Sequence, residues 1–203
     1  MYVIKLLIKI YGFNLFNIII VVNIIMYFTG EWNADNSIMT TILDDIEFYS
    51  GTERKKMLKV SPKEGGSMLF GTTWRSYLSP TKNRTFDPET GKYRTKVYDD
   101  YPELKDIFKE FSDYHLPNFT YSQVQLNKNF PCPPHRDSQN ITSSILCCFG
   151  DYSGGLTCVD INKKIKKIDA SIQPEEFNGA EHLHWVEPYK GTRYSLVFFN
   201  KIK

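Results

Sequence analysis

The chain contains a short segment whose side chains could bind one metal ion. His135 and Asp137 are separated by a single residue. In an extended segment, residues i and i+2 project to the same side, so this imidazole and this carboxylate can approach one ion. A His-x-Asp pair also arises often by chance, as a surface pair or a satisfied polar contact. The segment therefore predicts part of a metal site, which requires a third ligand from elsewhere in the chain.

The remainder of that site is expected in residues 177–196. This stretch holds His182 and His184, and Arg193 follows them. A turn over residues 188–191 would return the chain antiparallel beside itself and place the guanidinium deeper than the metal. Two histidines and a carboxylate on one face of an octahedron leave three positions open, which accept a bidentate 2-oxo acid and dioxygen. The planar fork of arginine suits the distal carboxylate of 2-oxoglutarate.

Short strands after residue 117 must hold these side chains. Apolar residues alternate over residues 121–126, whereas residues 143–149 form a continuous apolar run. Further strands are expected over residues 156–161, 163–168 and 194–199, with turns at residues 150–155 and 178–179. Several short strands separated by turns predict a sandwich or jelly roll.

Helices are expected before the strands. We predict a short helix around residues 39–48 and a polar surface loop over residues 79–96. An amphipathic helix follows, in which Asp100 can be the cap and Pro102 lies in the first turn. Its apolar residues recur at helical spacing and are Leu104, Ile107, Phe108 and Phe111. The predicted fold class is α+β, with a jelly-roll core and N-terminal supporting helices.

Composition limits the number of domains and the compartment. A chain of 203 residues can bury one sizeable core, and a second full domain is not expected. The net charge of +2 gives no argument for wrapping duplex nucleic acid, although a local basic groove remains compatible with it. The cysteines show no CxxC pair, so buried thiols in a reducing, intracellular compartment are expected. They are Cys132, Cys147, Cys148 and Cys158.

Residues 1–28 form a hydrophobic N-terminal segment with two interpretations. The uncharged run of residues 10–28 is just long enough to cross a bilayer as a helix, and lysines precede it. A membrane anchor would then hold the protein at a membrane. Asparagines interrupt the run, at a cost in hydrocarbon. The alternative is an extension outside the native protein, with Met26 or Met39 as the true start.

Ordered motifs in residues 121–199 resemble the double-stranded β-helix Fe(II)/2-oxoglutarate oxygenases. These motifs are His-Arg-Asp, a Gly-Asp-Tyr-Ser-Gly-Gly hairpin, and His-Trp-x-Glu-Pro-x-x-Gly-x-Arg-Tyr-Ser-Leu-Val-Phe-Phe. Within that superfamily the chain is most similar to the TET/JBP-like nucleobase oxygenases of viral and protist type. Their His-x-Asp-x-x-Asn signature is matched by residues 135–140, and their Arg-x-Ser by residues 193–195. The resemblance implies an oxygenase domain over residues 29–203.

The resemblance also implies roles for individual residues. His135, Asp137 and His184 would be the catalytic iron ligands, and His184 is preferred to His182 because it precedes Pro188 by four residues. The 2-oxoglutarate ligands would be Arg193 and Ser195, whereas Asn140 would contact the substrate. On the strand before the His-x-Asp segment, Gln125 and Asn127 could also hydrogen-bond the co-substrate, although ordinary inter-strand or turn hydrogen bonds explain them equally well. Fe(II), 2-oxoglutarate and dioxygen are the expected cofactors, with ascorbate in support. The cysteine-rich zinc-binding region of animal TET proteins is absent.

Three functions fit these residues. The first is hydroxylation of a nucleobase methyl group, with nucleic acid as the partner. Trp74, Arg75 and Tyr77 could then stack on a flipped base, although ordinary packing explains them equally well. The second is the same chemistry on a protein side chain of the prolyl type or on a small molecule, which a membrane anchor would favour. The third is a binding module without turnover.

Overall fold

The structure, a computed structural model, describes residues 27–51, 56–57, 64–73 and 85–201 of the chain. The expectations for residues 1–26 and for the stacking platform at residues 74–77 lie outside this part of the chain. Within the described ranges, no helix combines the length and the apolar composition that a membrane crossing needs.

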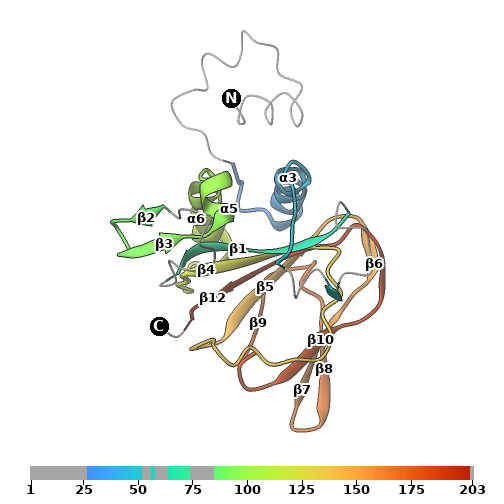
Figure 1. Cartoon of the computed structure of the whole chain (residues 1–203). Coiled ribbons are helices and arrows are strands. Elements are labelled where there is room, and N and C mark those ends of the chain that lie inside the picture. The colour runs from blue at the N-terminus through green and yellow to red at the C-terminus, as the bar shows by residue number, and fades with distance from the viewer. Residues whose placement is uncertain (1–26, 52–55, 58–63, 74–84, 202–203) are drawn as a thin grey trace.

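The helices of the described chain precede most of its strands (Figure 1). They are α3 (Trp32–Asp44), α5 (Lys96–Asp100) and α6 (Leu104–His115). The strands are β1 (Gly66–Thr73), β2 (Phe86–Asp87), β3 (Lys92–Arg94), β4 (Gln123–Lys128), β5 (Ser144–Phe149), β6 (Tyr152–Gly154), β7 (Thr157–Ile161), β8 (Lys164–Ile168), β9 (Glu175–Phe177), β10 (Leu183–Val186), β11 (Tyr189–Gly191) and β12 (Tyr194–Phe199).

Two antiparallel sheets organise the molecule. The larger sheet has the order β2-β3-β1-β4-β12-β5-β9, and the smaller has the order β10-β7-β8. A further pair joins β6 to β11. In Figure 1, α3 and α6 lie on one side of the larger sheet, and the smaller sheet lies toward the other. This is the α+β jelly-roll architecture that the strand pattern predicts.

The core is divided into two layers by the alternation of side chains along the strands. In β5, Cys147 belongs to the layer shared with the helices, whereas Leu146 and Cys148 belong to the layer that faces the smaller sheet. Residues of β12 alternate in the same way, because Leu196 packs against the helices and Val197 against the second layer. Odd-numbered residues of β12 therefore face the space between the sheets, where the polar side chains discussed below lie.

The predicted start of the amphipathic helix is wrong. Asp100 is the last residue of α5, and α6 begins at Leu104 after Glu103. Thr95 caps α5, because its hydroxyl accepts a hydrogen bond from the Tyr98 N–H at 3.4 Å. Glu103, which precedes α6, makes no side-chain cap hydrogen bond. Two short helices thus replace the single predicted one, while the predicted apolar face of α6 is buried as expected.

Two other boundaries differ from the prediction. The helix expected around residues 39–48 is α3, which begins seven residues earlier at Trp32 and ends at Asp44. Part of the expected loop at residues 79–96 is a hairpin, because β2 pairs with β3 and β3 pairs with the end of β1. Local polarity indicated a loop there, whereas pairing with a distant strand decides the conformation.

The strands β10 and β12 do not form the hairpin that the sequence predicted. β10 pairs with β7 in the smaller sheet, whereas β12 lies between β4 and β5 in the larger one. The intervening strand β11 pairs with β6 instead. Residues 183–186 and 194–199 therefore belong to different sheets, and His184 and Arg193 line one cavity without being hairpin neighbours.

A buried ion pair joins the two long helices at the end of α6. The Asp35 carboxylate, which is fully buried, lies 2.8 Å from Nε2 of His115. It also accepts hydrogen bonds from the N–H groups of Thr29 and Gly30. We expect Asp35→Ala to destabilise the fold by about 3 kcal/mol, because it leaves a buried imidazole without its partner. Urea unfolding checks this value.

The control for that variant is an exposed ion pair on α6, the helix that carries His115. Asp113 pairs with Lys109, and both side chains are more than half exposed. Asp113→Ala should change the free energy of unfolding by no more than about 0.5 kcal/mol. Equal effects of the two alanine variants would contradict a structural role for the Asp35–His115 pair.

Candidate active site

Three metal-capable side chains converge in the space between the sheets. His135, Asp137 and His184 each offer one ligand atom, and these atoms all lie within 4.8 Å of one another. The Nε2 atoms of His135 and His184 lie 3.4 and 3.7 Å from the two Asp137 oxygens. His184 is delivered by β10, and His135 is held beside it by two reciprocal backbone hydrogen bonds of 3.0 Å. Pairing between distant segments, rather than the two-residue spacing alone, completes the cluster.

Backbone carbonyl groups orient both imidazoles toward the same point. Nδ1 of His135 lies 2.9 Å from the carbonyl oxygen of Pro133, and Nδ1 of His184 lies 3.1 Å from that of His182. Each Nδ1 therefore donates a hydrogen bond to its carbonyl oxygen, so that Nε2 is the nitrogen with the lone pair in neutral His184, and in His135 once its second proton has left. Phe177 packs edge-on against the His184 ring at a centroid distance of 5.0 Å. Such outer contacts are those that fix ring orientation in metal sites.

The two imidazoles differ in their acidity. The hydrogen bond to Asp137 raises the pKa of His135 to about 10, whereas burial lowers the pKa of His184. Without a metal ion, His135 is therefore protonated at neutral pH and His184 is neutral. A metal ion must displace the His135 proton, so its affinity should increase with pH.

We expect the affinity for Mn(II), as a stable substitute for Fe(II), to rise by up to ~10-fold per pH unit between about pH 6 and 8. The sign follows because rising pH removes the proton that competes with the metal. Titration of the protein with Mn(II), followed by electron paramagnetic resonance, measures the affinity. A constant affinity across this range would contradict the proton displacement.

Gly179 leaves room for the cluster. A Cβ atom at this position would lie 3.1 Å from the Asp137 Oδ2 atom, 3.1 Å from Cε1 of His184 and 3.0 Å from the Phe177 ring. The Gly179 carbonyl oxygen also accepts a hydrogen bond from the Asp137 N–H at 2.8 Å. The loop between β9 and β10 thus supports two of the three candidate ligands at once.

We expect Gly179→Ala to lower the affinity for Mn(II) by ~10- to 100-fold, the usual cost of disturbing the groups that orient metal ligands. The added methyl group must displace the carboxylate or the imidazole. Gly51→Ala is the control, because a Cβ atom there meets nothing within 4 Å. Unchanged Mn(II) affinity in Gly179→Ala would show that the ligands tolerate the displacement.

Arg193 is a buried cation without a carboxylate partner among the described residues. Its side chain is 4% exposed, and Nη2 donates a hydrogen bond to Sγ of Cys148 at 3.1 Å. Nε has no hydrogen-bond partner in the described structure. The rings of Tyr152 and Tyr189 flank the guanidinium at 5.6 and 5.8 Å. Because a buried charge is costly without a counter-ion, this arrangement fits an anionic ligand.

A polar network lies between Arg193 and β1. Asn127 donates from Nδ2 to the Ser195 hydroxyl at 3.2 Å and accepts from the Ser67 hydroxyl at 2.5 Å. Gln125 donates to the Ser67 hydroxyl at 3.1 Å and to the Met68 carbonyl oxygen at 2.6 Å. The register explains the network, because Ser67, Asn127 and Ser195 are directly opposite one another in β1, β4 and β12. Asn127 and Ser195, the predicted co-substrate ligands, thus lie together in the cavity.

The remaining candidate residues have more local contacts. Asn140 lies 3.5 Å from Oδ2 of Asp137 and 3.2 Å from the Ser144 hydroxyl. It can therefore orient the carboxylate as well as face a substrate. His182 contributes its carbonyl oxygen to His184 and is not in the three-residue cluster of the described structure. The Cys132 thiol lies 3.6 Å from Nδ1 of His135 and is likewise outside that cluster.

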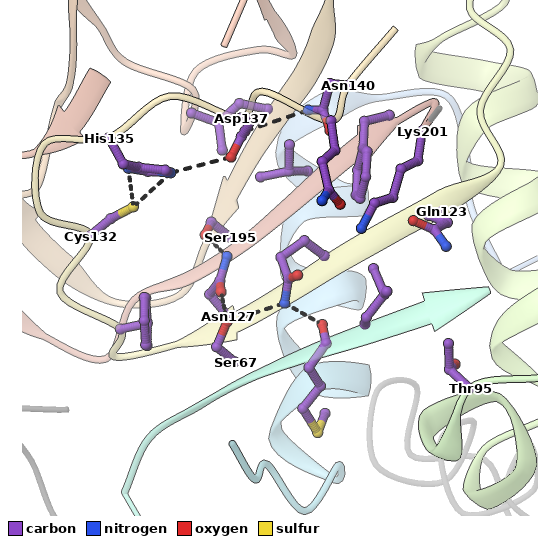
Figure 2. A pocket seen from close by; sticks show the side chains of 18 of the residues that line it. Ser67, Thr95, Gln123, Asn127, Cys132, His135, Asp137, Asn140, Ser195 and Lys201 are labelled. Atoms are coloured by element: carbon purple, nitrogen blue, oxygen red, sulfur yellow. Dashed lines mark hydrogen bonds and ion pairs between the residues drawn. The ribbon is translucent and has the colours of Figure 1, made fainter. Parts of the chain in front are cut away.

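One cavity of about 910 Å³ joins these groups. It is lined by the three clustered ligands, by Arg193 and by the network of Asn127 and Ser195. Figure 2 shows the labelled side chains around it, with His135 and Asp137 on one side and Gln123 and Lys201 on the other. The described lining contains one carboxylate, that of Asp137, and several basic side chains. These are Lys92, Lys96, Arg136, Arg193 and Lys201.

Comparison with known proteins identifies the fold. No protein-family model matches the sequence, and no curated protein matches it significantly. Among solved structures, NgTET1 in complex with 5mC DNA matches with a TM-score of 0.50 and 19% identity over 82% of this chain and 67% of that chain. The chain has the double-stranded β-helix fold of the Fe(II)/2-oxoglutarate oxygenases. At this identity the double-stranded β-helix match defines the fold and leaves the substrate open.

Two further double-stranded β-helix structures match at lower similarity. A Pseudomonas putida prolyl-4-hydroxylase has a TM-score of 0.44 and 13% identity, over 87% of this chain and 90% of that chain. An oxidoreductase of the 2OG-Fe(II) oxygenase family from Burkholderia pseudomallei has a TM-score of 0.39 and 15% identity, over 72% and 73%. The structure also brings together the three side chains that the sequence predicted as metal ligands.

Several residues that shape the candidate active site were not predicted from the sequence. Gly179 was predicted only as part of a turn, although a glycine directly before a candidate ligand segment is a detectable signal. The Cys148 contact with Arg193 was not foreseen, because it depends on the register of β5 against β12. Gln123 was also missed, since its role depends on which face of β4 it occupies.

Proposed function

We propose that this protein is an Fe(II)- and 2-oxoglutarate-dependent dioxygenase that hydroxylates a C–H bond. The observation that carries the proposal is a single cavity with the cluster of His135, Asp137 and His184 and a buried arginine without a carboxylate partner in the described chain. The cluster alone would fit several divalent metals. The buried cation beside it supports a co-substrate with a carboxylate, which a simple metal hydrolase does not need.

The residues fit the proposed cofactors. The two Nε2 atoms and the Asp137 carboxylate would hold Fe(II), and Arg193 would bind the distal carboxylate of 2-oxoglutarate, with Ser195 and Asn127 close by. When bound, the iron and 2-oxoglutarate supply the oxidising power for hydroxylation of a C–H bond by dioxygen. Arg193 offers its free Nε–H and its delocalised charge, so that binding of the carboxylate neutralises a buried cation.

The protein's own residues orient the reactants and keep water away. Pro133 and His182 hold the imidazole tautomers through their carbonyl groups, and Gly179 keeps the space for the carboxylate. Burial of His184 and Arg193 excludes water from the inner part of the cavity. Fixed ligands and a dry site are the contributions that a protein makes to cofactor chemistry.

We further propose that the C–H bond belongs to the methyl group of a nucleobase. The net charge of the whole chain is only +2, but the described cavity lining has a clear excess of basic side chains. Lys92, Arg136 and Lys201 line the cavity together with Lys96, which also pairs with Asp100. Basic side chains along a cavity suit a phosphate backbone. The fold match to NgTET1 in complex with 5mC DNA supports the same choice. Four free cysteines support an intracellular location as part of the proposal.

The decisive experiment offers different substrates to the protein with Fe(II), 2-oxoglutarate and ascorbate. Oligonucleotides with 5-methylcytosine or thymine compete with a pool of proline-containing peptides, and mass spectrometry measures succinate and oxidised products. We expect succinate formation coupled to a hydroxymethyl base. Peptide oxidation without base oxidation would replace the nucleobase substrate with the prolyl-type alternative. No succinate with any substrate would overturn the dioxygenase itself and favour a binding module.

A further inference from the structure

Gln123 is a buried side chain whose carboxamide oxygen has no partner in the described structure. The residue begins β4 and is 5% exposed, and its Oε1 atom is buried without a hydrogen bond. A buried acceptor that lacks a donor is costly, and most buried polar atoms in proteins are paired. The helices and sheets do not use this oxygen, which therefore needs an explanation of its own.

The orientation of the Gln123 carboxamide is fixed by its nitrogen atom, Nε2. Nε2 of Gln123 donates a hydrogen bond to the Thr72 carbonyl oxygen at 2.7 Å. Exchange of the two amide atoms would place an oxygen against that carbonyl oxygen, which cannot donate. Oε1 must consequently be the atom without a partner.

Gln123 packs closely against its neighbour in β1. Gly71 is directly opposite Gln123, and a Cβ atom there would lie 3.3 Å from Cγ of Gln123 and 2.8 Å from the Ser122 carbonyl oxygen, so the glycine makes room for the Gln123 side chain. Both Gln123 and the clustered metal ligands line the same cavity. Figure 2 shows Gln123 across that cavity from His135 and Asp137, on the side of Lys201. Arg193 and Asn127 are the residues proposed to bind the co-substrate, which leaves the side of the cavity with Gln123 and Lys201 for a substrate.

We infer that Gln123 determines substrate specificity by accepting a hydrogen bond from an exocyclic amino group of the substrate. This inference rests on the proposed function for the choice of a methylated pyrimidine as the substrate. Two such bases carry the same methyl group and differ beside it, because 5-methylcytosine has an amino group where thymine has a carbonyl oxygen. An amino group can donate a hydrogen bond to Oε1, whereas a carbonyl oxygen cannot donate and would repel it. The cavity should therefore prefer the amino-bearing base.

The test is a binding measurement that does not depend on turnover. The probes are short single-stranded oligonucleotides of deoxyuridine with one central 5-methylcytosine or thymine, and single strands avoid the cost of base flipping. Fluorescence anisotropy with Mn(II) and 2-oxoglutarate gives the two dissociation constants. We expect the wild-type protein to bind the 5-methylcytosine probe at least ~5-fold more tightly, and up to ~100-fold, as for one specific base contact.

Gln123→Met should reduce that preference to about twofold or less, since methionine has a similar shape and only a weak acceptor in its thioether sulfur. Gln125→Met is the matched control, because Gln125 lies on the same face of β4 and also donates to a backbone carbonyl group. It should keep the preference, whatever its effect on total affinity. Circular dichroism confirms that each variant is folded.

Each outcome decides the inference. Equal or tighter wild-type binding of the thymine probe, or no binding of either probe, overturns it even if Gln123→Met does not fold. A preference that survives in Gln123→Met also overturns it. A preference that Gln123→Met abolishes, in a protein that forms no succinate, would support the inference while the proposed dioxygenase function fails.

Discussion

His184→Ala should abolish succinate formation, with a loss of at least ~10³-fold in rate. The three ligands act as one unit, and removal of one member of such a unit costs nearly as much as removal of all. His184 is the most buried member of the cluster, with a side chain that is 6% exposed, so water cannot easily replace its nitrogen. Coupled succinate assays measure the rate, and elemental analysis measures the bound iron in the same samples.

His182→Ala is the matched control for this variant. His182 contacts His184 through its carbonyl oxygen, which alanine retains, and its side chain is outside the cluster of the described structure. We expect His182→Ala to keep bound iron and most of the rate. The reverse result, with iron lost in His182→Ala and kept in His184→Ala, would assign the third ligand to His182.

Arg193→Met should raise the dissociation constant for 2-oxoglutarate by ~30- to 1000-fold, which corresponds to about 2–4 kcal/mol for one lost partner of a buried charge pair. The guanidinium is 4% exposed and has no carboxylate partner among the described residues, so the ligand is its expected counter-ion. Isothermal titration in the presence of Mn(II) measures the constant. Arg193→Lys should recover only part of the affinity, because an ammonium group cannot form the paired hydrogen bonds.

Thermal unfolding gives a second, independent measure of the contribution of Arg193 to 2-oxoglutarate binding. Saturating 2-oxoglutarate should stabilise the wild-type protein by about 2.7 kcal/mol at a concentration 100 times the dissociation constant. Arg193→Met should lose this stabilisation, whereas its stability without ligand should equal or exceed that of the wild type. The control is Arg136→Met, whose guanidinium is exposed and donates only to the Glu181 carbonyl oxygen. Unchanged 2-oxoglutarate affinity in Arg193→Met would end this part of the proposal.

Strand positions were the part of the fold that local patterns predicted well. β5, β7, β8 and β12 lie within one residue of the predicted runs, because continuous or alternating apolar residues report directly on a buried face. The predictions failed where a partner distant in sequence decides the conformation. The polar residues 86–94 form a hairpin beside β1, and Asp100 is the last residue of a helix that Thr95 caps.

The structure brings the predicted site residues to one cavity, but by a construction that differs from the prediction. The prediction placed His184 and Arg193 on one hairpin, and the structure places them on different sheets. Their joint access to one cavity comes from the packing of the smaller sheet over the larger one. Gly179 and Gln123 were not predicted as site residues, because the importance of a missing Cβ atom or a free acceptor depends on neighbours from other strands.

The amino-acid sequence by itself determined the donor chemistry of this protein: two imidazoles, a carboxylate and a guanidinium in motifs that resemble one superfamily. It also determined the alternation that divides each strand between two layers of core. Only the tertiary structure decided which histidine joins the cluster, that the guanidinium is buried without an acid in the described chain, and that Gln123 faces the same cavity. The physical reason is that side-chain type is local, whereas burial and the lack of a partner depend on strands brought together from distant parts of the chain.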